Sequence, residues 1–227
     1  MKTPKAIFFD LDGTLLETSY EISDAINDTM EHFGLDKIDE EECKEWIGHG
    51  TLHLMRLATA KVKKISYKQA QDDTQMAALY DYFRIRYFER TGTRSWLFEG
   101  ALKLLQTLKK NNIKIGIITN KETAFVEKIL TAHKLDTLTD CIVCGDTLEV
   151  KKPDPAGVFY MMDKLDLKIT EDILFIGDSK TDILTARNAK LRCWAVTYGY
   201  NAGDKIQDSN PDKIIDSLED IIKLIRL

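Results

Sequence analysis

Two aspartates one residue apart are the first feature of this sequence that suggests chemistry. The stretch FFDLDGTLLET, residues 8 to 18, places Asp10 and Asp12 directly after an apolar run. If that run is a strand, both side chains point to the same face, because side chains alternate along a strand. Two carboxylates in one small space repel each other unless a cation lies between them or one of them holds a proton. The pair predicts such a site, and an Asx turn at the strand end is the structural alternative.

Three further apolar runs also end in polar side chains. Thr119 and Asn120 follow IGII, Lys151, Lys152 and Pro153 come after CIVCGD, and Asp178, Ser179 and Asp182 follow ILFIG. In open parallel α/β sheets, ligands bind beyond the carboxyl ends of the strands, so we expect these side chains to meet there. Carboxylates in excess over one lysine call for a divalent cation, and hard oxygen ligands select Mg²⁺ rather than zinc.

Such a constellation suits phosphoryl transfer. A Mg²⁺ ion, an ammonium group and neutral donors around a carboxylate neutralise the charge on a phosphoryl group during in-line transfer. The carboxylate of Asp10 can itself be the nucleophile. Asp12 can protonate the leaving oxygen and then take a proton from the attacking water.

Some of these residues also have structural interpretations. Thr119 and Asn120 taken alone fit a turn and a helix cap. The doublet Lys151-Lys152 fits a solvated face, with the choice between the two lysines open. Asp178 can cap the helix that follows it, and Asp182, four residues further on, can be a surface acid.

The elements that must position these side chains alternate along the chain. Strand-length apolar runs occur at KAIFFD, IKIGIITN, CIVCGD, DILFIGD and RCWAVTYG, and helix-length stretches with apolar spacing of three to four residues separate most of them. Strands with little polar interruption are covered on both faces. We therefore predict an α/β fold with a Rossmann-like parallel sheet between helix layers.

Residues 17–92 interrupt this alternation of strands and helices. They contain no strong strand signal but three helical stretches: SYEISDAINDTMEHFG, EECKEWIGHGTLHLMRLATA and SYKQAQDDTQMAALYDYFRIRYFER. The prediction is a catalytic core of residues 1–16 and 93–227 and a small helical cap domain of residues 17–92. The cap is expected to close over the carboxyl edge of the sheet.

Composition excludes several classes of protein. The 227 residues carry 32 basic and 37 acidic side chains, a net charge of -5, which provides no basic field for nucleic acid. No apolar run approaches the roughly 18 residues of a membrane span, and the first residues lack a secretory signal, so we expect a cytoplasmic protein without a membrane partner. Four cysteines are best explained as free thiols, although CIVC has redox-like spacing.

The motifs together resemble a known family. DLDGT, the ITN triplet, the lysine of KKPDP and the GDSKTD run, in that order, are similar to the four motifs of the haloacid dehalogenase superfamily. The helical insertion after the first motif, WIGHG inside it and FEGALKLLQTLKKNNIKIGIITNK after it resemble the phosphoglycolate phosphatase-like branch.

This resemblance implies a role for each motif residue. Asp10 matches the nucleophile that becomes an aspartyl phosphate, and Asp12 the general acid/base that also supplies a backbone carbonyl to Mg²⁺. Thr119 and Asn120 match the phosphate-binding motif. Lys152 matches the lysine that holds nucleophile and phosphate together. Asp178 matches a metal ligand, and Asp182 fits a metal-supporting role, so the implied metal group is Asp10, Asp12, Asp178 and Asp182.

The resemblance predicts a Mg²⁺-dependent phosphatase for a small phosphomonoester such as phosphoglycolate, a nucleotide or a sugar phosphate. The alternatives are a mutase of the β-phosphoglucomutase type and, from another class, a phosphate-accepting receiver module. The polar break GHGT within the cap predicts a substrate-contacting loop, with His49 and Arg56 as candidate substrate-binding residues, although a plain turn between helices fits it as well. We expect a monomer or a homodimer.

Overall fold

A six-stranded parallel sheet forms the centre of the protein in the computed structural model, which describes residues 3–168 and 172–226. In spatial order its strands are β5 (Cys141–Val143), β4 (Lys114–Ile118), β1 (Ala6–Phe9), β6 (Ile173–Gly177), β7 (Arg192–Val196) and β8 (Lys213–Ile215). β1 lies in the middle and pairs with β4 and β6 in parallel register. The predicted α/β class is confirmed.

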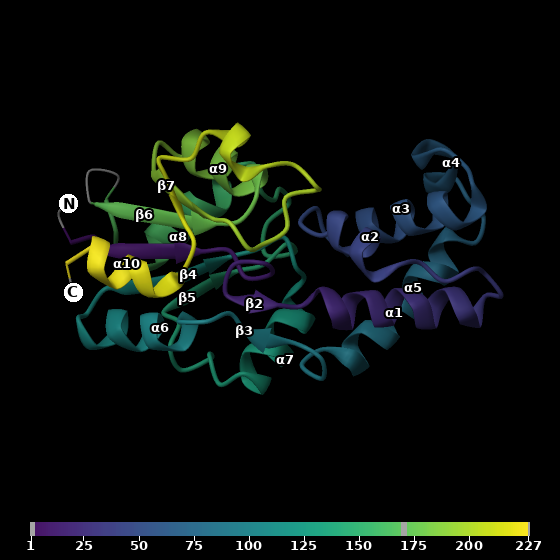
Figure 1. Cartoon of the computed structure of the whole chain (residues 1–227), viewed down its shortest axis with the longest axis horizontal. Coiled ribbons are helices and arrows are strands. Elements are labelled where there is room, and N and C mark those ends of the chain that lie inside the picture. Colours follow the sequence, from purple (N-terminus) through teal and green to yellow (C-terminus); the bar gives the residue numbers. More distant parts are fainter. Residues whose placement is uncertain (1–2, 169–171, 227) are drawn as a thin grey trace.

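Helices cover both faces of this sheet (Figure 1). One layer holds α6 (Ala101–Lys110), α7 (Thr123–Ala132) and α10 (Leu218–Leu224), and the other holds α8 (Ala156–Lys164) and α9 (Lys180–Asn188). Along β1, Ile7 and Phe9 belong to the first apolar cluster, and Ala6 and Phe8 to the second. All four are fully buried, because alternate side chains of a doubly covered strand both enter a core. A 3₁₀ helix, η1 (Ile206–Ser209), lies between β7 and β8.

The helical insertion forms the predicted cap. It comprises α1 (Ser19–His32), α2 (Glu40–Glu45), α3 (Thr51–Lys63), α4 (Tyr67–Gln71) and α5 (Met76–Arg90). Four of these helices, α1, α2, α3 and α5, share an apolar cluster, to which Phe125 of α7 also contributes. In Figure 1 they extend from the end of the sheet that lies opposite the two chain termini. The connecting segments pair with each other as the antiparallel strands β2 (Leu16–Glu17) and β3 (Trp96–Leu97).

Local structure departs from the sequence prediction in the cap helices and in the short strands β2, β3 and β8, which were not predicted. Two of the three predicted helical stretches in the cap are each divided in two. Gly48 and Gly50 have φ of 120° and 90°, which separates α2 from α3. In the other stretch, α4 ends at Gln71 and α5 begins at Met76, so residues 72–75 form the break. Strand β8 was not predicted, because three residues at a sheet edge are too short to show a period.

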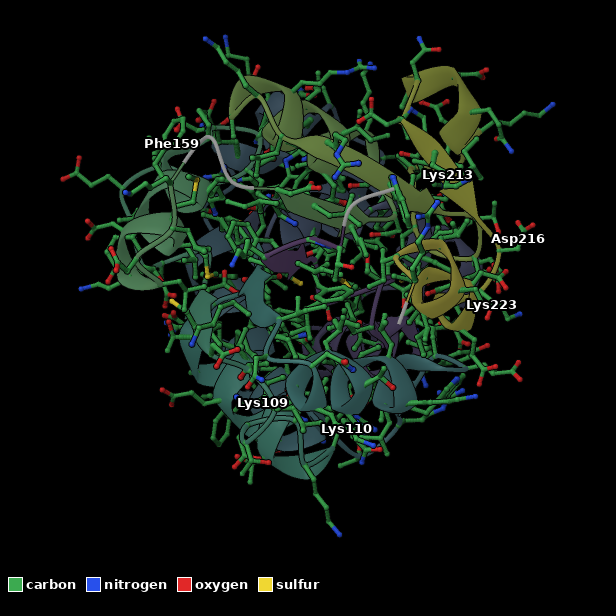
Figure 2. All side chains as sticks on the ribbon, turned by 90° about the vertical axis from the view of Figure 1, so that its left-hand side faces the viewer. Lys109, Lys110, Phe159, Lys213, Asp216 and Lys223 are labelled. Carbon is green, nitrogen blue, oxygen red and sulfur yellow. The ribbon has the colours of Figure 1, made fainter. Side chains whose placement is uncertain are left out.

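The end of the core that faces away from the cap is a charged surface. Figure 2 looks onto this end and shows Lys109, Lys110, Lys213 and Lys223 at its rim, all of them exposed. Within the described part of the chain, no helix has the length and apolar character that a membrane crossing needs. The four cysteines are free, and three of them are buried.

Candidate active site

Asp10 directly follows β1, and its carboxylate is buried. Its backbone N–H still donates to the carbonyl of Ile176 at 2.9 Å, so the sheet register determines where the residue lies. One carboxylate oxygen lies 2.6 Å from Nζ of Lys152. Burial raises the pKa of Asp10 to about 7 even though Lys152 opposes the shift. Lys152 alone therefore does not fully compensate the charge of an ionised Asp10 carboxylate.

Lys152 connects two of the acids. Its Nζ lies 2.7 Å from Oδ1 of Asp182 as well as against Asp10. Burial lowers the pKa of Lys152, but the two carboxylates outweigh this effect and the pKa is raised overall. The ammonium therefore stays charged beside the predicted nucleophile. Lys151, its neighbour in the doublet, is exposed.

Asp178 and Asp182 complete a buried acidic group with Asp10. One carboxylate oxygen from each of the three lies within 4.8 Å of the others. Asp178 accepts hydrogen bonds from Thr14 Oγ1 at 3.0 Å and from the N–H of Tyr200 at 2.5 Å, both neutral donors. Burial, and then Asp182 and Asp10, raise the pKa of Asp178 well above its usual range.

Asp182 is completely buried in the first turn of α9. Its Oδ2 accepts from Ser179 Oγ at 2.6 Å and from the N–H groups of Ser179 and Asp178, in a capping box. The interpretation as a surface acid is therefore wrong for Asp182. Because its hydrogen-bonding capacity is largely used, Asp182 orients Asp178 and Lys152 beside the site.

Asp12 lies apart from this group. Its Oδ1 accepts from Lys121 Nζ at 2.7 Å and from Thr18 Oγ1 at 2.7 Å. Asp10 and Asp12 therefore have different lysines as partners. Gly13, with φ of 83°, lets the chain turn here, and a Cβ atom on it would come within 2.3 Å of Asp178 Oδ2.

Thr119 and Asn120 follow β4 at the same edge of the sheet, and both are buried. Asn120 Nδ2 donates to the carbonyl of Gly48 in the cap at 2.9 Å and to that of Lys152 at 3.1 Å. Its Oδ1 is buried and has no hydrogen-bond partner among the described residues. The side chain links the cap loop to the core and leaves an acceptor available to a bound donor.

Five of the predicted residues line a pocket between cap and core, and Asp178 and Asp182 are joined to it through Asp10 in the buried triad. The volume of the pocket is about 40 Å³. The core contributes Asp10, Asp12, Thr119, Asn120, Lys121 and Lys152, and the cap contributes Ile22, Trp46, Ile47, Gly48, Gly50, Thr51, Leu54 and Tyr87. The cap side is mostly apolar, so the charged groups are concentrated on the core side.

His49 and Arg56 are not among the residues that line this pocket. His49 is exposed and packs edge-to-face against His53, with ring centroids 5.3 Å apart. Arg56 lies further along α3, and its Nε is buried without a partner among the described residues. Their suggested contact with substrate stays a prediction.

Sequence reasoning missed three residues that contact the aspartates: Thr18, Lys121 and Tyr200. Lys121 had a signal, because it directly follows Asn120 at a strand end. Thr18 and Tyr200 lie in segments without a recognisable motif, and only the fold brings them to Asp12 and Asp178.

The carboxylates in and beside the pocket fit a divalent cation. Four carboxylates, those of Asp10, Asp12, Asp178 and Asp182, stand against the ammonium groups of Lys121 and Lys152. Buried carboxylates are costly unless positive charge compensates them, and oxygen ligands are those that hard cations prefer. The buried triad of Asp10, Asp178 and Asp182 can therefore hold a metal ion.

Comparisons with known proteins agree with this geometry. A family model described as haloacid dehalogenase-like hydrolase matches residues 7–196. The chain is 34% identical over 221 residues to phosphoglycolate phosphatase 1 of Pseudomonas aeruginosa, which covers 97% of this chain and 79% of that protein. It is 35% identical to the phosphoglycolate phosphatase of Photobacterium profundum, over 98% of this chain and 96% of that one.

A solved structure has the same architecture. The crystal structure of a predicted phosphoglycolate phosphatase from Haemophilus somnus superimposes with a TM-score of 0.88 and 33% sequence identity, over 99% of both chains. Because the sequence and the fold match over the full chain and the pocket has the expected acidic residues, the chain belongs to the haloacid dehalogenase-like hydrolases. Within them it is similar to the phosphoglycolate phosphatases.

Proposed function

We propose that this protein is a Mg²⁺-dependent phosphatase that hydrolyses a small phosphomonoester through an aspartyl phosphate on Asp10. The observation that carries the proposal is the buried carboxylate of Asp10, held 2.6 Å from Lys152 at the floor of a pocket between cap and core. Asp10 attacks the phosphorus, and Lys152 holds the nucleophile beside the phosphoryl oxygens. The Thr119 hydroxyl donates to those oxygens from the neighbouring strand end, and the Asn120 side chain holds the cap loop and the Lys152 backbone beside them.

Asp12 moves the proton in both half-reactions. It donates a proton to the leaving oxygen in the first and takes one from water in the second. Asp10 and Asp178, with the backbone carbonyl of Asp12, would hold Mg²⁺ directly, and Asp182 would support the site by orienting Asp178. The bound ion would neutralise the phosphoryl oxygens. The cap excludes bulk water from the reaction.

Three features support a small substrate with a second anionic group, such as phosphoglycolate. The relatives that match the full chain carry that name, and the pocket is small. The N-terminal end of α3 also lines the pocket through Gly50 and Thr51, and no side chain caps its first turn. A helix N-terminus favours an anion, so it suits a carboxylate.

The test is phosphate release from phosphoglycolate, nucleoside monophosphates and hexose phosphates, with Mg²⁺ or EDTA. We expect Mg²⁺-dependent release, fastest from phosphoglycolate, and at least a roughly 10³-fold loss in Asp10→Asn because the nucleophile is gone. Interconversion of hexose 1-phosphate and 6-phosphate without release would show a mutase instead. Stable phosphorylation without turnover would show a receiver module. Cytoplasmic localisation and a monomeric or homodimeric state stay predictions.

A further inference from the structure

Lys121 is a buried ammonium group to which the four family motifs assign no role. Its side chain is 2% exposed, and it lines the pocket from the start of the segment that joins β4 to α7. Burying an ammonium group is costly unless hydrogen bonds and an opposite charge compensate it. Lys121 obtains both from Asp12 Oδ1, 2.7 Å away, and from the hydroxyl of Tyr87, to which it donates.

The two donors to Asp12 share one carboxylate oxygen. Lys121 Nζ and Thr18 Oγ1 both donate to Oδ1, each at 2.7 Å. Among the described residues, none donates a hydrogen bond to Oδ2. The carboxylate is therefore held by one oxygen, and the other is left for proton transfer in the pocket.

Both donors depend on the position of the cap. Thr18 is the residue before α1, in the first connecting segment. Tyr87 belongs to α5, and the Lys121 ammonium also lies 5.0 Å from the centre of its ring. Burial raises the pKa of Tyr87 well above its usual range, so its hydroxyl stays neutral and can accept from the ammonium. The contacts that hold the Asp12 carboxylate through Thr18 and Lys121 therefore form together only when α5 of the cap lies against the core.

We propose that Lys121 is a positioning residue that holds Asp12 in place to activate the attacking water. This inference rests on the proposed phosphatase function. In the second half-reaction, the water oxygen bonds to phosphorus, the bond from phosphorus to the Asp10 oxygen breaks, and Asp12 Oδ2 takes the water proton. Inorganic phosphate leaves, and Asp12 gives that proton to the leaving alcohol of the next ester.

The proposal predicts a particular kinetic pattern for donors with an acidic leaving group, such as p-nitrophenyl phosphate or acetyl phosphate. These leaving groups depart without help from an acid, so Asp12 is needed only in the second half-reaction. Because kcat/KM reports only the steps up to departure of the leaving group, it should survive the loss of Lys121, while kcat should fall. The phosphorylated enzyme should then accumulate.

The experiment compares Lys121→Met with the wild type on both donors and on phosphoglycolate, with acid quenching to trap the phosphorylated enzyme. For the acidic donors, we expect kcat to fall at least about 10-fold and kcat/KM to change less than about 3-fold, with more trapped phosphoenzyme. For phosphoglycolate, both parameters should fall. Lys103→Met, on the exposed side of α6, is the matched control and should behave as wild type.

Thr18→Val removes the second donor to Oδ1 and should show the same pattern in a weaker form, so it carries the test if Lys121→Met does not fold. An equal loss of kcat and kcat/KM on the acidic donors in both variants, without accumulated phosphoenzyme, would mean that Lys121 only supports the fold, and would overturn the inference. A wild type that releases phosphate from none of the donors would refute the proposed function itself, and the inference with it.

Discussion

The four aspartates of the pocket differ in what compensates their charge. Asp10 and Asp182 share the ammonium of Lys152, and Asp12 has that of Lys121. Asp178 receives hydrogen bonds only from neutral groups, and no ion pair is found for it among the described residues. The side of the triad at Asp178 therefore has the greatest need of a cation.

This difference predicts how pH and Mg²⁺ act on stability. In the metal-free protein, Asp10 keeps its proton up to about pH 7, whereas the unfolded chain loses it near 3.8. Between these values the native state binds more protons, so its free energy of unfolding falls as the pH rises. Because the metal needs ionised carboxylates, we expect Mg²⁺ to raise the melting temperature more at pH 8 than at pH 5.5.

Thermal unfolding in EDTA and in Mg²⁺ at the two pH values measures this. The control is Asp10→Asn, which cannot titrate at that position and should show a flatter pH dependence between pH 4 and 7. If wild type and Asp10→Asn had parallel pH profiles in EDTA, burial of Asp10 would not control stability in the way described.

At the scale of elements, the loop after β7 joins the triad to the first connecting segment of the cap. The N–H of Tyr200 donates to Asp178, and its hydroxyl donates to Glu17. The same hydroxyl accepts from the N–H groups of Thr18 and Ser19, at 2.9 and 3.1 Å. One buried tyrosine thus contacts both an acid of the metal group and the start of α1.

Tyr200→Phe should loosen this junction. The change leaves the N–H of Thr18 without its acceptor and removes one donor to Glu17, while Ser19 N–H still donates to Glu17. Leaving a buried polar group unpaired costs about 1–3 kcal/mol. We expect the free energy of unfolding to fall by about that amount, with faster hydrogen exchange at residues 17–20.

Denaturant unfolding and hydrogen exchange measure the two effects. Tyr160→Phe is the matched control, because that tyrosine lies half-buried on α8, where its ring faces Lys164. Equal exchange rates at residues 17–20 in Tyr200→Phe and in the control would contradict the role given to the Tyr200 hydroxyl.

At the scale of the whole molecule, hydrogen bonds across the pocket hold the cap against the core. Asn120 donates to Gly48, and Thr51 Oγ1 donates to Glu122 Oε1 at 2.6 Å. Thr51 also lies 2.9 Å from the hydroxyl of Tyr80, and the other oxygen of Glu122 is buried without a partner among the described residues. The Thr51 hydroxyl is therefore a main polar contact of the closed arrangement.

Thr51→Val should shift the cap towards an open arrangement. The variant keeps the shape of the side chain but leaves Glu122 without its donor, which costs the closed form about 1–3 kcal/mol. If substrate binds to the closed form, KM should rise about 5- to 100-fold while kcat changes little, because the population able to bind is reduced. Steady-state kinetics test this, and small-angle scattering should show a larger radius of gyration.

Thr107→Val is the control, since that hydroxyl bonds only within α6 and is exposed. A KM in Thr51→Val that equals the value of this control would show that the contact between Thr51 and Glu122 does not hold the cap closed.

The sequence by itself determined the α/β class, the helical insertion and most of the charged and polar residues that the core brings to the site. These features could be predicted because the spacing of apolar residues and the polar residues at strand ends can be read from short segments of sequence. Parallel strands then bring their carboxyl ends to one edge of the sheet. Asp10, Asp12, Thr119, Asn120, Lys152 and Asp178 could be placed there before the fold was known.

Only the tertiary structure decided which charges face each other. The KKPDP motif favoured Lys152 over Lys151, but only the fold shows that the Lys152 ammonium lies between two carboxylates, Asp10 and Asp182, while Lys151 is exposed. Lys121 pairs with Asp12 across 109 positions, and Asn120 meets Gly48 across 72. No local pattern encodes such contacts, because they join residues far apart in the sequence and depend on how the elements of the core, and the cap against the core, pack together.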